Sequence, residues 1–210
     1  ASGWPALDAE LPGGGWPVGA LTELLFDREG IGELRLLIPA LAGLTHAGRW
    51  VAWVAPPHLP YAPALAAAGV VLSRLLVVGR SHPRETLWAA EQALRSGAMG
   101  AVVFWPGEID DRALRRLQLA AEAGAAAGFL FRPLQAAEAP SPAALRLALA
   151  PQAGGLVLRI LKRRGPTATL LLHLRFSAPL SQGGEGGEEG AGSAFTPTLP
   201  PEERGGRRAA

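Results

Sequence analysis

The sequence predicts an α/β fold in which a mostly parallel sheet is flanked by helices and followed by an antiparallel meander and a disordered tail. Between about residues 22 and 132, short apolar runs alternate with longer helical patterns, as in repeated βαβ units. The short runs are continuously apolar, which is typical of buried parallel strands. From about residue 144 the pattern changes, because apolar and polar residues then alternate.

The first part of the chain carries the parallel sheet. Its apolar runs predict strands over 21–26, 50–55, 75–79, 101–105 and 129–132. The longer segments between these strands predict helices over about 33–47, 61–68, 84–96 and 110–127. This order of elements predicts parallel strands joined by helices that cover the sheet.

The last part of the chain reads differently. Segments 144–150, 155–164 and 168–176 alternate apolar and polar residues, which predicts an antiparallel meander that extends the sheet edge. Residues 177–210 are rich in glycine and glutamate, then in proline and charge, so we expect a disordered tail. The tail is either inert or a recognition segment around 195–201. We therefore divide the chain into residues 1–20, which pack on the core, a domain over 21–176, and the tail.

Composition excludes several classes of protein. The 210 residues are 49% hydrophobic and contain no cysteine, which suits a buried core in a reducing compartment. No apolar run approaches the roughly 20 residues that span a bilayer, and no signal-peptide pattern begins the chain. The four histidines are scattered, so no metal site is expected. We expect a cytoplasmic protein that does not bind membranes.

The loop between the first expected strand and helix resembles a phosphate-binding loop that lacks its reactive groups. Such a loop places lysine and then serine or threonine after its last glycine, so that the lysine offsets phosphate charge and the hydroxyl holds Mg²⁺. Here Gly30 and Gly32 are present, but Glu33 and Leu34 follow them. A carboxylate at this position repels a triphosphate, so we expect the loop to be retained as structure.

Three segments resemble the ATPase core of the RecA/RadA recombinases. They are 3-GWPALDAELPGGGWPVGALTELLFDREGIGELRLLIPALAGL-44, 50-WVAWVAPPHLPYAPALAAAGV-70 and 88-WAAEQALRSGAMGAVVFWP-106. The resemblance implies a RecA-like core. Where the recombinases have a catalytic glutamate and the Walker B aspartate, this chain has Pro57 and Trp105. With Glu33, these replacements remove the general base, the Mg²⁺-holding acid and the phosphate lysine, so we expect no ATPase activity and no cofactor.

Within that superfamily, residues 2–176 resemble the ImuA and SulA families, through motifs such as AAEQALRSGA, LRRLQLAAEAGAAAGFLFRP and LVLRILKRRG. Resemblance to ImuA implies a damage-induced (SOS) adaptor in error-prone translesion DNA synthesis and mutagenesis. Such an adaptor binds RecA and the inactive polymerase ImuB, and reaches an error-prone DNA polymerase indirectly. Length and the match at the N-terminal segment favour ImuA.

Two alternatives differ in function. Resemblance to SulA implies a cell division inhibitor that binds FtsZ and blocks its polymerisation, and the shared core does not separate SulA from ImuA. The weaker alternative is an enzyme that still binds nucleotide, with Arg28 or Arg35 replacing the lysine.

Two basic groups are candidate contacts for a partner or, without base specificity, for DNA. The first is the turn of Lys162, Arg163 and Arg164 with Arg159 nearby, and the second is a stripe at helical spacing formed by Arg112, Arg115 and Arg116. The alternative interpretation is structural, because charged turns and the outer faces of helices are commonly solvated.

The six tryptophans are expected to be mostly core residues. Trp4 and Trp16 either pack on the sheet or anchor a partner, and packing is the favoured interpretation. Trp105, at the end of its strand, is expected to fill the former nucleotide cavity.

Overall fold

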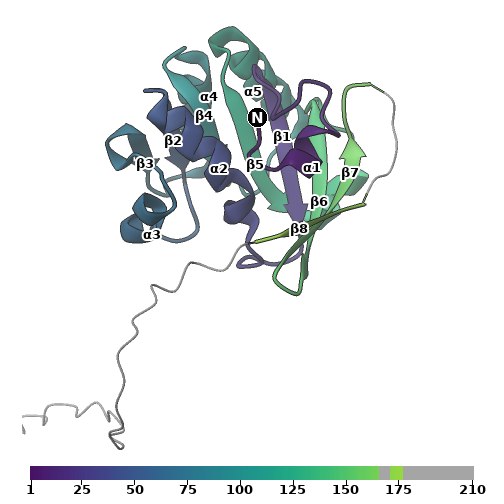
Figure 1. Ribbon diagram of the computed structural model, residues 1–210. Helices are drawn as coiled ribbons and strands as arrows, with labels where there is room; N and C mark the ends of the chain where they lie inside the picture. The colour runs from purple at the N-terminus through teal and green to yellow at the C-terminus, as the bar shows by residue number, and fades with distance from the viewer. Residues whose placement is uncertain (166–170, 177–210) are drawn as a thin grey trace, which may run out of the picture. The chain divides into compact units, whose positions relative to one another are not determined.

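An eight-stranded sheet organises the chain, in the order β3-β2-β4-β5-β1-β6-β7-β8 (Figure 1). The computed structural model describes residues 1–165 and 171–176, which belong to one compact unit. The strands are β1 (Ala20–Phe26), β2 (Trp50–Val54), β3 (Leu75–Val78), β4 (Met99–Phe104), β5 (Ala127–Pro133), β6 (Leu145–Gln152), β7 (Gly155–Lys162) and β8 (Leu171–Arg175). Strands β1 to β6 pair in parallel, whereas β6, β7 and β8 pair antiparallel in sequence order. The predicted α/β class, with its parallel sheet and antiparallel meander, is confirmed. The predicted disordered tail lies outside the described residues.

The helices begin and end where local chemistry requires. They are α1 (Pro5–Asp8), α2 (Glu33–His46), α3 (Ala62–Ala67), α4 (Pro83–Arg95) and α5 (Asp111–Gly124), with short 3-10 turns η1 (Leu72–Arg74) and η2 (Leu134–Glu138). Asp110 caps α5 by accepting a hydrogen bond from the Ala113 backbone at 2.7 Å. The helix ends before the predicted residue 127 because Ala125 adopts the left-handed conformation and β5 begins two residues later.

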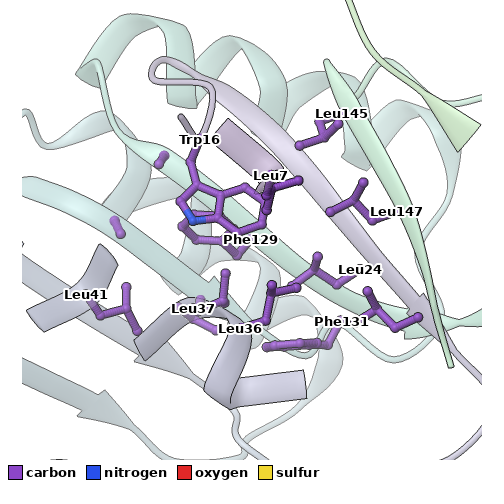
Figure 2. Close-up of a cluster of buried hydrophobic side chains, with 14 of the residues drawn as sticks. Leu7, Trp16, Leu24, Leu36, Leu37, Leu41, Phe129, Phe131, Leu145 and Leu147 are labelled. Carbon is purple, nitrogen blue, oxygen red and sulfur yellow. The ribbon is translucent and has the colours of Figure 1, made fainter. Parts of the chain in front are cut away.

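Helices cover both faces of the sheet, and each face has its own hydrophobic core. Leu24 of β1 faces one core, with Leu36 and Leu37 of α2. Leu21, three residues earlier on the same strand, faces the other core, with Leu94 of α4 and Leu117 of α5. The separation follows from strand geometry, since successive side chains point to opposite faces. Figure 2 shows the first core, in which Trp16 lies over Phe129 with the ring centroids 5.3 Å apart.

The N-terminal segment contributes to the first core. Leu7 and Leu11 are buried there with Trp16. Trp4 is half-buried and its indole Nε1 donates a hydrogen bond to the Leu36 carbonyl at 2.9 Å. These contacts fasten residues before β1 to α2.

A buried ion cluster lies where β1, β5 and β6 meet. Glu23 of β1 is fully buried and accepts hydrogen bonds from Arg132 at 3.0 Å, Arg146 at 2.7 Å and the Ser141 hydroxyl at 2.7 Å. Arg146 also donates to carbonyls at the end of η2, including that of Ala139 at 3.0 Å. The cluster thereby ties the loop before β6 to the central strand.

Two further findings concern the described residues only. None of their helices is long and apolar enough to cross a membrane. They hold no group of three or more His, Asp or Glu side chains arranged to bind a metal ion.

Candidate functional site

The candidate site lies at the carboxyl ends of β1, β2 and β4. β1 pairs in parallel with β5, β5 with β4, and β4 with β2. The loops that follow these strands therefore meet at one edge of the sheet, where α/β proteins commonly bind ligands. We call the cavity of about 400 Å³ at this edge the proline pocket. It is lined by Glu29, Gly30, Glu33, Leu34, Trp53, Pro56, Pro57, His58, Leu59, Pro60, Tyr61 and Trp105.

The pocket brings together five of the six residues predicted to mark a degenerate nucleotide site. Gly30, Glu33, Leu34, Pro57 and Trp105 all line it, whereas Gly32 lines an adjoining open depression of about 610 Å³. The spacing along the sequence therefore corresponds to one place in the fold. That these residues descend from a nucleotide site stays a prediction.

The loop from Asp27 to Gly32 depends on its last two glycines. Gly30 and Gly32 have φ angles of 80° and 98°, in the left-handed region that side chains with a Cβ rarely adopt. Gly32 is the residue that precedes the first turn of α2. The glycines let the chain turn from β1 into α2.

Glu33 is the first residue of α2, at the N-terminal end of the helix. Its side chain is turned inward, with 8% of the residue exposed. Oε1 accepts a hydrogen bond from the Gly30 backbone N–H at 3.2 Å, and Oε2 has no hydrogen-bond partner among the described residues. Backbone N–H groups at a helix N-terminus attract anions, and Glu33 places the chain's own carboxylate in the first turn of α2.

Phe176 closes the loop from the other side. Its ring lies so near Gly32 that a Cβ there would be 2.6 Å from Cε2 of the phenylalanine. The ring also packs against Trp4, with centroids 5.6 Å apart, and under the guanidinium of Arg35 at 4.4 Å. The space beside the loop glycine is therefore filled by an aromatic side chain.

Trp105 forms an aromatic stack behind the loop. Its ring stacks on Phe131 at a centroid distance of 4.9 Å and meets Trp53 edge-on at 5.9 Å. Aromatic side chains thus gather just after the carboxyl end of β4, and that Trp105 replaces a Mg²⁺-holding acid stays a prediction.

The loop after β2 presents apolar side chains to solvent. Leu59 is 89% exposed and Tyr61 is 73% exposed. His58 directly precedes Leu59 in sequence, and its Nε2 lies 3.5 Å from the Glu29 carboxylate. Sequence reasoning missed Leu59 and Tyr61, because a short proline-rich loop has no periodicity from which exposure can be inferred.

Comparison with known proteins identifies the family. The family model for the cell division inhibitor SulA matches residues 19–128, which is more than half of the chain. The chain belongs to the SulA family. The matched residues run from β1 to the start of β5 and include the loops that line the proline pocket.

Individual SulA relatives agree with the family match. The cell division inhibitor SulA of Yersinia enterocolitica is 31% identical over 116 residues, which cover 55% of this chain and 69% of the relative. That of Edwardsiella piscicida is 36% identical over 111 residues, which cover 51% of this chain and 66% of the relative. The solved RadB recombinase has a TM-score of 0.67 at 17% identity and covers 84% of this chain and 96% of its own, which shows the shared RecA-like fold.

These findings correct the expected function. The interpretation as an ImuA-type adaptor in translesion synthesis, with RecA, ImuB and an error-prone polymerase as its partners, was wrong, because the family and its relatives are named as division inhibitors. The motifs belong to a core that both families share, and length was a poor guide between them. The relatives are named as inhibitors and not as enzymes, which agrees with the expectation of a non-enzymatic protein.

The basic turn at the end of β7 lies outside the residues of the SulA match. Lys162 donates to the Ser141 carbonyl at 2.7 Å, and Arg163 pairs with the Glu10 carboxylate at 3.0 Å. Arg159 and Arg164 are exposed. Two of the four predicted contact residues therefore hold the protein's own segments together.

The basic stripe on α5 is likewise partly used within the fold. Arg112 and Arg115 are exposed, whereas Arg116 pairs with Glu91 of α4, which also binds Arg95 at 3.1 Å. A contact role for these arginines, and for those of the turn, stays a prediction.

Most of the tryptophans lie in the core, as expected. Trp16 and Trp53 are buried, and Trp4 and Trp105 pack against the same cluster. Trp88 on α4 is the clearest exception, with 61% of the residue exposed.

Proposed function

We propose that this chain inhibits cell division by binding FtsZ, the partner implied by the resemblance to SulA, and that it catalyses no reaction. The observation that carries the proposal is the SulA match over residues 19–128, together with relatives named as cell division inhibitors. Action in the cytoplasm is part of the proposal, and a chain without cysteine suits that reducing compartment.

The loop chemistry supports a binding role without ATP hydrolysis. Glu33 places a carboxylate on the Gly30 N–H where a nucleotide would need a free donor and a nearby lysine. Phe176 lies against Gly32, and Trp105, which directly follows β4, carries no acid. Each of these features opposes the binding of a triphosphate with its metal ion.

We assign the FtsZ contact to the loop after β2. Leu59 and Tyr61 expose large apolar side chains within the residues of the family match. Exposed aromatic and apolar residues beside a pocket are typical anchors of protein interfaces. The loop follows a buried strand, so it is held on a rigid support.

The test is the effect of the full chain on purified FtsZ. We expect the wild-type chain to reduce GTP-dependent sedimentation of FtsZ polymers as its concentration approaches that of FtsZ. The double variant Leu59→Ala with Tyr61→Ala should lose most of this effect while its thermal unfolding is unchanged.

Val18→Ala is the matched control. Val18 is 70% exposed but lies just outside the residues of the family match. Its substitution should leave inhibition unchanged. Undiminished FtsZ polymerisation at a several-fold excess of the wild-type chain would overturn the proposed function.

A further inference from the structure

The proline pocket combines apolar walls with a buried acid. Its apolar lining includes Pro57, Leu59, Pro60, Tyr61 and Trp105, and Glu33 lines it from the first turn of α2. Glu29 lines the same cavity from the loop and is exposed. The pocket thus carries negative charge within an otherwise apolar lining.

Two buried polar atoms of the lining residues lack partners. Within the described part of the chain, neither Oε2 of Glu33 nor Nε1 of Trp53 makes a hydrogen bond. Buried polar groups are nearly always paired, and an unpaired carboxylate oxygen costs more than a neutral group. Among the described residues, nothing donates a hydrogen bond to Oε2 of Glu33, so a bound ligand could supply that donor.

We propose that the proline pocket binds a basic side chain, arginine in preference to lysine, on the surface of the partner protein. A cation with several N–H donors would satisfy Glu33 Oε2 and be attracted by Glu29. Its aliphatic stem matches the prolines and Leu59, and a planar guanidinium stacks on an aromatic face such as that of Trp105.

Other ligands fit the pocket less well. A phosphate or carboxylate would meet the Glu33 carboxylate directly and be repelled. A metal ion would require several oxygen or nitrogen ligands, and the described residues contain no such group of acids and histidines. A basic side chain satisfies the acid and also covers the apolar walls.

The exposed apolar residues place this pocket within the proposed interface. Leu59 and Tyr61 both line the pocket and extend to solvent. Apolar contacts around a buried charge exclude water and strengthen the ion pair, as at interface hot spots. The choice of FtsZ as the source of the basic side chain rests on the proposed function; the chemistry of the pocket does not.

A small probe tests the pocket without FtsZ. The full chain, labelled with ¹⁵N, is titrated with N-acetylarginine methylamide, and its neutral counterpart N-acetylcitrulline methylamide serves as the control ligand. We expect a saturable shift of the indole N–H signals of Trp53 and Trp105, assigned from tryptophan-to-phenylalanine variants. The citrulline compound should produce at least about tenfold weaker binding, because it lacks the charge.

Glu33→Gln is the decisive variant, because it keeps the shape of the side chain and an oxygen for the Gly30 N–H. It should weaken arginine-probe binding by roughly tenfold or more, since the charged acceptor is removed. Glu85→Gln makes the same chemical change on the exposed first turn of α4 and should have no effect. Equal shifts with both probes, or unchanged binding by the Glu33 variant, would overturn the proposal.

A parallel FtsZ titration separates this inference from the proposed function. If wild-type chain binds FtsZ, Glu33→Gln should bind it about 30-fold more weakly, as expected for loss of one partner of a buried charge pair, while Glu85→Gln binds normally. Equal FtsZ binding by both variants would overturn the inference and leave the proposed function standing. Absence of FtsZ binding by the wild-type chain would overturn the proposed function, while the arginine probe would still decide what the pocket binds.

Discussion

Glu33 reaches back along the chain to accept a hydrogen bond from the backbone of Gly30, three residues earlier. One carboxylate oxygen thereby satisfies the loop, while the other is buried without a partner in the described residues. The same side chain thus stabilises local structure with one atom and destabilises it with the other.

This division predicts a gain in stability when the charge is removed. Glu33→Gln should leave the free energy of unfolding equal to that of the wild type or raise it by up to about 2 kcal/mol, because an unpaired buried charge costs more than an unpaired amide. Urea denaturation followed by tryptophan fluorescence measures the difference. A loss greater than about 1 kcal/mol would show that the charge itself stabilises the fold.

Gly32 should tolerate no side chain. Gly32→Ala combines an unfavourable φ of 98° with a contact of 2.6 Å to the Phe176 ring, so a loss of about 1 to 3 kcal/mol is expected. Gly43→Ala is the control, since Gly43 is in α2 with no atom within 4 Å of the added Cβ. That substitution should stabilise by up to about 1 kcal/mol through helix propensity. Thermal and urea unfolding measure the stability of both variants. If Gly32→Ala changed the free energy of unfolding in the same direction as Gly43→Ala, the packing described for Phe176 would be contradicted.

The buried cluster around Glu23 should respond strongly to loss of one partner. Arg146→Met leaves the fully buried carboxylate with fewer donors and should cost about 3 to 5 kcal/mol. Combining it with Glu23→Leu should recover part of that loss, because the unpaired charge is then absent. Arg159→Met, an exposed arginine on β7, should change stability by less than about 0.5 kcal/mol. The wild type, the Arg146→Met, Glu23→Leu and Arg159→Met variants and the double variant are compared by urea denaturation. Additive losses in the double variant would argue against coupling.

Nucleotide should not stabilise the protein. We expect ATP or GTP with Mg²⁺ at about 5 mM to leave the Tm unchanged, whereas a ligand with a Kd near 1 mM would add about 1 kcal/mol and shift the Tm by several degrees. Differential scanning fluorimetry makes the measurement, with sodium triphosphate as a control for ionic effects. A saturable rise in Tm with nucleotide and not with triphosphate would restore the case for a nucleotide site.

The sheet could be predicted because its signal is local. Strands β1, β2, β4 and β5 are short apolar runs that are almost wholly buried, and burial on both faces requires that pattern. The end of α5 was placed too late, since the sequence around Ala125 is alanine-rich and does not mark the left-handed residue that ends the helix. Helix propensity alone favoured continuing it.

The site was predictable only in part. Gly30, Gly32 and Glu33 were singled out by a known loop pattern, and Pro57 and Trp105 by the resemblance to the recombinase core. The exposure of Leu59 and the unpaired indole of Trp53 depend on how distant loops pack, which spacing does not encode. The choice of ImuA over SulA failed because the motifs resembled both families and so could not separate them.

Phe176 also sets an order of events during synthesis. It follows β8 and packs against Gly32, so a contact near the end of the described chain completes a loop that begins soon after residue 26. A nascent chain must therefore release nearly the whole domain from the ribosome before this loop is finished. Until then the parallel strands can form, but the loop between β1 and α2 lacks the aromatic side chain that packs against it.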